Sequence, residues 1–379
     1  MKINTHLMLV SGQPTPNLTP ALDPVTAPQR IILLVSPDMH RYADWLTEIY
    51  QPRGLKIERW LVDNSWDSEH IQSRLLELLE FETQEGRDLA LNATGGTKVM
   101  SIAAYEAFRA YGLPVYYVHP ERDLLMWMHP QKRPPHQLAD RIRIADFIKA
   151  HGGQVISRGD IQVPPAYREF AQQLIDEIDY YSDALGVLNW YANSAERDLR
   201  SEKLEARHLR FSALQDLVDK LDSLGVLRLR DKYLVFSDEK ARFFANGGWL
   251  EQYVFASLNG LKTQLPAIQD TAQGVEIIHS GGSKNELDVV FLADNHLYLI
   301  ECKAKTFKRD DTVSGANTLY KLDSLADTLG GLQARAMLIS YKELSPFDAQ
   351  RARDLRIAML HGRQLQSLQT HLHHWIQSG

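Results

Sequence analysis

Short apolar segments alternate with amphipathic ones from the N-terminus to residue 118, and this alternation constrains the fold more than any other feature. The segment 30–35 is continuously aliphatic, as expected for a strand whose two faces are both covered by helices. Ile71, Leu75 and Leu78 recur at helical spacing. The pattern predicts strands at 6–10, 30–35, 55–62, 88–92 and 114–118, and helices at 39–50, 68–81 and 97–111. Strands that alternate with helices indicate an α/β fold with a mostly parallel, Rossmann-like sheet.

The remainder of the chain divides where its composition changes. Residues 11–28 contain five prolines, so we expect no regular structure there. Pro- and His-rich sequence at 119–140 suggests a domain boundary. A predicted helix at 214–224 is followed by a hairpin around Asp231-Lys232, which resembles the wing of a winged-helix module. We predict three parts: an N-terminal domain at 1–138, a helical or winged-helix-like linker at 139–245, and a second α/β domain at 246–379.

Charge and cysteine content limit the choice of compartment and partner. The formal net charge is −6, so binding of a nucleic acid would require a local basic patch. Cys302 is the single cysteine, which excludes an internal disulfide and suits a reducing cytoplasm. The longest aliphatic run, at 31–35, is far shorter than the roughly 20 residues of a membrane span. The N-terminus lacks the pattern of a signal peptide, and we expect a cytoplasmic protein with no membrane contact.

Three charged residues interrupt two adjacent apolar segments in the last third of the chain. If Asp294-Asn295 forms a two-residue hairpin turn, Asp288 lies directly opposite Glu301. Side chains alternate along a strand, so Lys303 shares the face of Glu301. Two carboxylates and an ammonium group therefore converge on one hairpin.

Opposed carboxylates repel each other unless a cation compensates for their charges. Mg²⁺ or Mn²⁺ bound to Asp288 and Glu301 would polarise a phosphodiester and lower the pKa of a bound water. Lys303 would then offset the charge that develops on the phosphoryl oxygens. This pattern predicts a metal-dependent phosphodiesterase that cuts nucleic acid. The alternative is a surface strand pair with charged residues on its solvated face.

A Gly-rich segment, Asn92-Ala93-Thr94-Gly95-Gly96-Thr97-Lys98, joins a predicted strand to a predicted helix. Such a junction can receive a phosphate or a hydroxyl-rich ligand at the helix N-terminus. It is not a Walker loop, because Leu91 stands where that motif requires a glycine and Val99 follows the lysine. The alternative is a plain turn with Thr97 as the helix N-cap.

The arrangement of Asp288, Glu301 and Lys303 resembles the PD-(D/E)xK nucleases of the restriction-endonuclease-like fold. The proline of that motif is missing, since Leu287 precedes Asp288. The resemblance implies a further metal contact from a glutamate on the preceding helix, and Glu251 fits by position. Residues Lys305, Lys308 and Arg309 follow the motif and could steer a phosphate backbone.

The loop at 92–101, together with Leu9-Val10-Ser11-Gly12-Gln13 and Leu34-Val35-Ser36, resembles the CARF domain of CRISPR-associated proteins. The layout of nearly the whole chain resembles the ancillary nucleases of type III CRISPR antiviral defence. This resemblance implies a homodimer whose paired CARF domains bind a cyclic oligoadenylate, most often cyclic tetraadenylate, as an allosteric activator. The activator-binding residues that it implies are Ser11, Gln13, Thr15, Ser36, Asn92, Thr94, Gly95, Gly96, Thr97 and Lys98.

Two other functions remain open at this stage. In one, the chain is a ligand-sensing transcription regulator whose wing-like segment binds DNA and whose nuclease fold is vestigial. In the other, it is an unregulated repair or restriction nuclease. The intact Asp288, Glu301 and Lys303 argue against a vestigial site. The sequence does not distinguish a DNA substrate from an RNA substrate.

Overall fold

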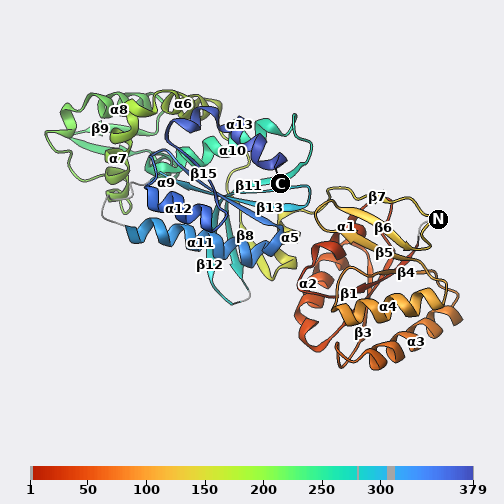
Figure 1. Cartoon of the computed structure of the whole chain (residues 1–379). Coiled ribbons are helices and arrows are strands. Elements are labelled where there is room, and N and C mark those ends of the chain that lie inside the picture. The colour runs from red at the N-terminus through yellow and green to blue at the C-terminus, as the bar shows by residue number, and fades with distance from the viewer. Residues whose placement is uncertain (1–2, 280, 305–311, 379) are drawn as a thin grey trace. The chain divides into compact units, whose positions relative to one another are not determined.

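The computed structural model describes residues 3–279, 281–304 and 312–378. The chain forms two compact units (Figure 1). The first comprises Met1–Val155, Ile278–Lys284 and Leu292–Leu297. The second comprises Ile156–Ile277, Asn285–Phe291 and Tyr298–Gly379. No helix in the described residues is long and apolar enough to cross a membrane.

A seven-stranded sheet with the order β3-β2-β1-β4-β5-β6-β7 forms the centre of the first unit. Its strands are β1 (Thr5–Leu9), β2 (Arg30–Val35), β3 (Lys56–Leu61), β4 (Leu89–Asn92), β5 (Val115–His119), β6 (Leu124–His129) and β7 (His136–Gln137). The first five strands pair in parallel, as the alternating pattern predicts. Every residue of β1, β2 and β4 is buried, whereas the edge strand β3 is largely exposed. The predicted Rossmann-like sheet is confirmed.

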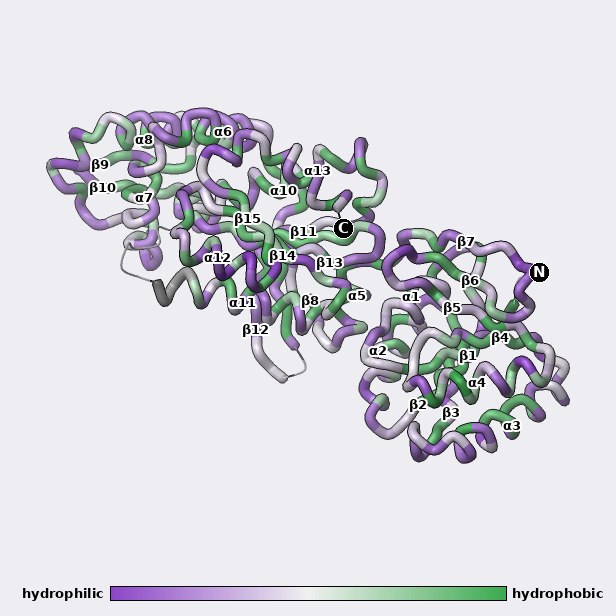
Figure 2. The backbone as a smooth tube through the Cα atoms, in the orientation of Figure 1, coloured by the Kyte–Doolittle hydropathy of each residue, from purple (hydrophilic) through white to green (hydrophobic). Residues whose placement is uncertain are grey.

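Helices cover this sheet because their apolar stripes match its buried faces. They are α2 (His40–Tyr50), α3 (Ser68–Gln84) and α4 (Lys98–Ala110), and α5 (Ile144–Ala150) packs against α2. Leu75 of α3 and Met100 of α4 belong to one core cluster with Leu7, Ile32 and Leu91 of the strands. Figure 2 shows hydrophobic residues along β1 and β4, which is the pattern of strands enclosed on both sides.

The prediction of irregular structure at 11–28 is wrong, because α1 (Thr15–Leu22) lies within this segment. Pro16 occupies the first turn, where a backbone N–H has no helical partner. Pro20 lies inside the helix and cannot donate to the carbonyl of Pro16. Asn92 replaces that missing donor, since its Nδ2 lies 2.8 Å from the carbonyl oxygen of Pro16. A hydrogen bond from a distant strand therefore permits this proline-containing helix.

The segment at 119–140 contributes two strands to the first sheet. β6 pairs with β5 in antiparallel fashion, and β7 pairs with β6. The Pro- and His-rich composition concealed these strands, and the first compact unit continues to Val155. The division at 138 and 245 stays a prediction.

The second unit begins with helices and a small hairpin. These are α6 (Pro165–Asp176), α7 (Ile178–Ser194), α8 (Ser212–Ser223), β9 (Leu227–Arg230), β10 (Tyr233–Phe236) and α9 (Glu239–Phe243). Asp231 and Lys232 both have positive φ angles, of 50° and 70°, which suits a tight two-residue turn between antiparallel strands. The predicted hairpin at this position is confirmed.

A six-stranded sheet with the order β15-β14-β13-β12-β11-β8 follows. Its strands are β8 (Gly153–Ser157), β11 (Ile268–His279), β12 (Lys284–Ala293), β13 (His296–Lys303), β14 (Ala334–Ser340) and β15 (Ala358–His361). The helices are α10 (Trp249–Leu261), α11 (Thr312–Gly330), α12 (Pro346–Asp354) and α13 (Leu368–Gln377). The described residues therefore form an α/β protein with two large sheets and the two-stranded sheet of β9 and β10.

Candidate active site and ligand loop

The hairpin of β12 and β13 carries Asp288, Glu301 and Lys303. Its turn consists of Asp294 and Asn295, which have φ angles of 46° and 54°. The Asp288 carboxylate lies next to β13, because the backbone N–H of Cys302 donates to its Oδ2 at 2.7 Å. Glu301 and Lys303 form an ion pair of 2.6 Å between Oε1 and Nζ. The three residues therefore lie at the same end of one hairpin.

Helix α10 adds Glu251 to this group. A π-helical turn, η4 (Phe244–Gly248), precedes the helix, and Gly247 within it has a φ angle of 110°. A Cβ at Gly247 would collide with the side chain of Ala304, directly after β13. The glycine thus permits the start of α10 to approach the end of β13. The result is a small cavity of about 180 Å³ lined by Glu251, Asp288 and Lys303.

Burial dominates the electrostatics of this cavity. Burial raises the pKa of Glu251 to about 9, with repulsion from Asp288, Glu286 and Glu301 as further causes. Burial and then the charge of Glu301 raise the pKa of Asp288 to about 7. Burial alone would lower the pKa of Lys303, but its ion pair with Glu301 outweighs this effect and the pKa is raised. The site therefore holds more negative charge than Lys303 compensates.

The donor set fits a hard divalent cation, since it consists of carboxylate oxygens in need of positive charge. In the described residues, no three His, Cys, Asp or Glu side chains are already arranged as a metal cluster. The ion pair with Lys303 occupies one oxygen of Glu301. Lys305, Lys308 and Arg309 lie outside the described residues.

Asn189 is a residue of this region that the sequence did not reveal. It lies on α7 and is only 6% exposed. Its Nδ2 donates to the carbonyl oxygen of Ala304, so it anchors the chain directly after Lys303. No local sequence pattern links these two residues, because they are 115 positions apart.

The predicted ligand residues gather at one edge of the first sheet. β1, β2 and β4 are adjacent and parallel, so the segments after their carboxyl ends lie together. A Cβ at Gly95 would collide with the carbonyl oxygen of Leu9, and Gly96 has a φ angle of 72°. Both glycines are therefore required for the loop to pass close to β1. Thr97 is the N-cap of α4, and its hydroxyl accepts from the N–H of Met100 at 3.1 Å.

These residues differ in whether a ligand could reach them. Thr15, Ser36 and Asn92 are at most 4% exposed and lie beneath the surface. The hydroxyl of Thr94 donates to Asn92 Oδ1 at 2.7 Å and accepts from a backbone N–H of β5. A second set faces solvent: Gln13 and Lys98 are exposed, and Ser11, Gly96 and Thr97 are partly exposed.

Trp66 at the same edge was missed by the sequence analysis. It follows β3, and its side chain is 72% exposed. The hydroxyl of Thr97 donates to the carbonyl oxygen of the preceding residue, Ser65, at 2.8 Å. The sequence indicated its location only through its position a few residues after a predicted strand.

Comparisons with known proteins agree with this architecture. Residues 5–147 match the family model of the Card1 CARF domain, and residues 238–378 match that of the Card1-like endonuclease domain. The crystal structure of protein VC1899 from Vibrio cholerae is 31% identical, with 98% of each chain covered and a TM-score of 0.88. No curated protein matches the chain at a significant level.

Two further solved structures are similar. Can2 from Sulfobacillus thermosulfidooxidans, in complex with cyclic tetra-adenylate, is 26% identical, with a TM-score of 0.81. That match covers 98% of this chain and 99% of Can2. A type III CRISPR defence DNA nuclease activated by cyclic oligoadenylate is 18% identical, with a TM-score of 0.61. This match covers 95% of this chain but 48% of that nuclease, and it shows likeness of fold alone.

The first sheet has a Gly-rich loop at its carboxyl edge, and the second carries a half-buried site of carboxylates and a lysine. Together with the two family matches, this arrangement defines a fusion of a CARF domain with an endonuclease domain. The high coverage of VC1899 extends this match over both domains. The chain belongs to the Card1 family.

Proposed function

We propose that this chain is a metal-dependent endonuclease of type III CRISPR defence, activated by a cyclic oligoadenylate, with cyclic tetra-adenylate as the activator. The observation that supports it best is the cavity in which Glu251, Asp288 and Lys303 converge beside Glu301. A Card1-like endonuclease domain includes all four residues. The complex of Can2 with cyclic tetra-adenylate supports the choice of activator.

The residues of the site have distinct tasks in this proposal. Mg²⁺ or Mn²⁺ would be held by Asp288 and Glu301, with Glu251 as a further contact, and would supply Lewis-acid polarisation of the phosphodiester and an activated water. The N–H of Cys302 fixes the orientation of the Asp288 carboxylate. Lys303 remains charged and offsets negative charge on the phosphoryl oxygens. These roles amount to a PD-(D/E)xK mechanism.

In the CARF domain, the exposed residues Gln13 and Lys98 and the partly exposed Ser11 would contact the activator. The lysine supplies positive charge at the N-terminus of α4, where the helix dipole also favours a phosphate. The buried residues Thr15, Ser36 and Asn92, together with the partly exposed Thr94, would position the loop, while Gly95, Gly96 and Thr97 shape it. A four-fold ring suits a two-fold homodimer, since each protomer can contribute the same half-site.

The proposal divides the chain into the CARF domain at 1–138, a linker at 139–245 and the nuclease domain at 246–379. The linker carries the wing-like hairpin of β9 and β10. We also propose a restriction-endonuclease-like fold for the third part, supported by the order of the acidic residues along β12 and β13. Activation then requires that the activator binds two states of the dimer with different affinity.

The decisive experiment incubates supercoiled plasmid and labelled single-stranded RNA with the protein and Mn²⁺, with and without cyclic tetra-adenylate. Cleavage only with the activator is expected. Glu301→Ala should abolish cleavage and leave activator binding unchanged by calorimetry. Cleavage regardless of the activator would refute the switch, and cleavage in EDTA would refute the metal-dependent mechanism. Tight activator binding without any cleavage would favour the ligand-sensing regulator.

A further inference from the structure

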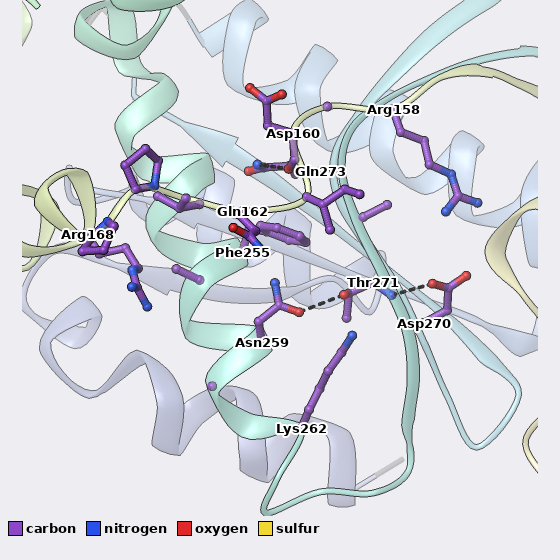
Figure 3. Close-up of a pocket in the computed structure, with 18 residues that line it drawn as sticks. Arg158, Asp160, Gln162, Arg168, Phe255, Asn259, Lys262, Asp270, Thr271 and Gln273 are labelled. Atoms are coloured by element: carbon purple, nitrogen blue, oxygen red, sulfur yellow. Dashed lines mark hydrogen bonds between the residues drawn. The ribbon is translucent and has the colours of Figure 1, made fainter.

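A large groove in the second unit is separate from the carboxylate cavity. We call it the α10 groove; it has a volume of about 1200 Å³ (Figure 3). Helix α10 forms one wall and β11 forms the other, while the segment that follows β8 crosses above them. Asn259 of α10 and Thr271 of β11 join the walls, with 2.9 Å between Oδ1 and Oγ1. The proposed function leaves this space without a role.

The α10 groove exists because β8 is much shorter than its neighbour. β8 ends at Ser157, whereas β11 runs from Ile268 to His279. The two chains remain together as far as Gly159, whose N–H donates to the carbonyl oxygen of Gln273 at 2.8 Å. Beyond this point, the chain leaves the sheet and reaches α6 through Pro164-Pro165. The first residues of β11 are thereby left open to the groove.

Helix α10 connects this groove with the carboxylate site. Phe255 and Asn259 line the groove and follow Glu251 at intervals of four residues. Residues at this spacing lie along one side of a helix. At 1.5 Å per residue, Asn259 is about 12 Å from Glu251 along the axis. That distance corresponds to about three or four nucleotide steps of a duplex at 3.4 Å per step.

The charged residues of the α10 groove favour an anionic occupant. Arg158, Arg168 and Lys262 line it, against the carboxylates of Asp160 and Asp270. Lys240 forms an ion pair with Asp160 at 2.8 Å and reduces the negative charge further. The groove is therefore locally basic in a chain whose formal net charge is −6.

Both arginines are available to such an occupant. They are exposed, and no carboxylate in the described part of the chain forms an ion pair with either of them. Figure 3 places Arg158 and Arg168 on opposite sides of the groove, with Lys262 at its lower end. A strand of phosphates in the groove would thus meet cations on both sides.

An added peptide strand fits this groove less well. Such a strand would use open backbone N–H groups along the edge of β11. The N–H of Thr271 instead donates to the Asp270 side chain at 3.1 Å, which blocks a position on that edge. Arginine side chains give no specific advantage to a peptide backbone, whereas they bind phosphates in two-point contacts.

We propose that the α10 groove holds the phosphodiester backbone of the substrate nucleic acid beside the cleavage site, with Arg158 and Arg168 as phosphate contacts. This inference rests on the proposed nuclease function. It assigns the two arginines to substrate binding and not to the chemical step. Phe255 is only 2% exposed and serves as the floor of the groove.

The test measures the binding of a short fluorescein-labelled DNA duplex and of a labelled single strand by anisotropy, in EDTA so that no cleavage occurs. The full-length protein is compared with Arg158→Ala/Arg168→Ala between about 50 and 200 mM salt. The matched control is Arg228→Ala/Arg230→Ala, which removes two exposed arginines from β9. A second variant, Arg158→Lys/Arg168→Lys, keeps both charges.

The slope of log K against log salt is negative, and loss of two phosphate contacts should make it shallower. The expected reduction in its magnitude is about 1.8 for a duplex, or about 1.4 for a single strand. The form of substrate with the larger effect identifies the occupant. The lysine variant should keep the wild-type slope, and the β9 control should bind as wild type does. In cleavage assays, the alanine variant should raise KM and leave kcat unchanged.

Each other result has one meaning. If the wild-type protein neither binds nor cuts nucleic acid, the proposed function fails. If it cuts, but the alanine variant and the β9 control have equal slopes, the groove assignment alone is overturned. A loss of affinity confined to the β9 control would place the nucleic acid on the wing-like hairpin and also overturn the assignment. The assignment would also be overturned if the groove bound a peptide and the alanine substitutions did not change nucleic-acid binding.

Discussion

Replacement of Glu251 by glutamine should stabilise the metal-free protein. Burial and three neighbouring carboxylates raise the pKa of Glu251 from 4.5 to about 9, so the folded state holds a proton that the unfolded state releases. When the pKa of a carboxyl group is higher in the folded state than in the unfolded state, the folded protein becomes less stable as the pH rises. This loss occurs between the pKa of the unfolded state and the pKa of the folded state. The penalty therefore grows from about pH 4.5 and is complete near pH 9.

Below the folded pKa, the size of the effect follows from the difference between the pH and the unfolded pKa of 4.5. At pH 7, the proton uptake costs about 3 kcal/mol, at 1.36 kcal/mol per pH unit. Glutamine fills the same space without this cost. A gain of about 3 kcal/mol corresponds to a rise in Tm of about 6 to 12 °C for a unit of this size. Asp288, whose pKa is raised from 3.8 to about 7, adds a penalty that begins at a lower pH and is nearly complete by pH 7.

Thermal unfolding in EDTA at several pH values, and again with Mn²⁺, tests this reasoning. Glu251→Gln should melt above wild type in EDTA, and its advantage should shrink towards pH 5. Mn²⁺ should stabilise wild type more than the variant, because binding to the folded state raises stability by mass action. Glu169→Gln, on the exposed face of α6, is the control and should change stability by less than about 0.5 kcal/mol. Equal Tm values in EDTA would refute the buried-charge argument, and equal Mn²⁺ shifts would remove Glu251 from the metal site.

Two predictions concern the CARF domain. Lys98→Ala should weaken the binding of cyclic tetra-adenylate about tenfold, as expected for the loss of a charge-assisted contact. The shift in Tm caused by Mn²⁺ should stay unchanged. An unaltered affinity by calorimetry would refute the loop assignment. Asn92→Ala should destabilise the protein by about 3 kcal/mol, because it leaves the Pro16 carbonyl and the Thr94 hydroxyl without their buried partner. A chemical denaturation midpoint equal to that of wild type would show that α1 does not depend on this hydrogen bond.

The parts of the fold that could be predicted from the sequence are those set by neighbouring residues. Apolar periodicity located β1 to β5 and α2 to α4, because each element buries a face that its own sequence defines. The turn at Asp294-Asn295 could also be predicted, and in the structure Asp288 contacts the backbone of Cys302 near the end of β13. A hairpin is local, so turn length alone determines its register.

The sequence missed the features that depend on distant contacts. Helix α1 contains Pro20 and persists because Asn92, more than seventy positions away, satisfies the carbonyl of Pro16. Strands β6 and β7 lie in Pro- and His-rich sequence and are held by pairing with β5. Neither segment contains a propensity or pattern that identifies the distant residues with which it pairs.

By itself, the sequence determined the kinds of chemistry available: carboxylates and a lysine on one hairpin, and a Gly-rich loop after a buried strand. The tertiary structure decided which groups meet. It brought Glu251 to the hairpin through the left-handed Gly247, and it buried Asn92 and Thr15 while it left Lys98 exposed. It also opened the α10 groove where β8 stops short of β11. The physical reason is that covalent neighbours specify local conformation, whereas burial, raised pKa values and cavities arise only when distant segments exclude water together.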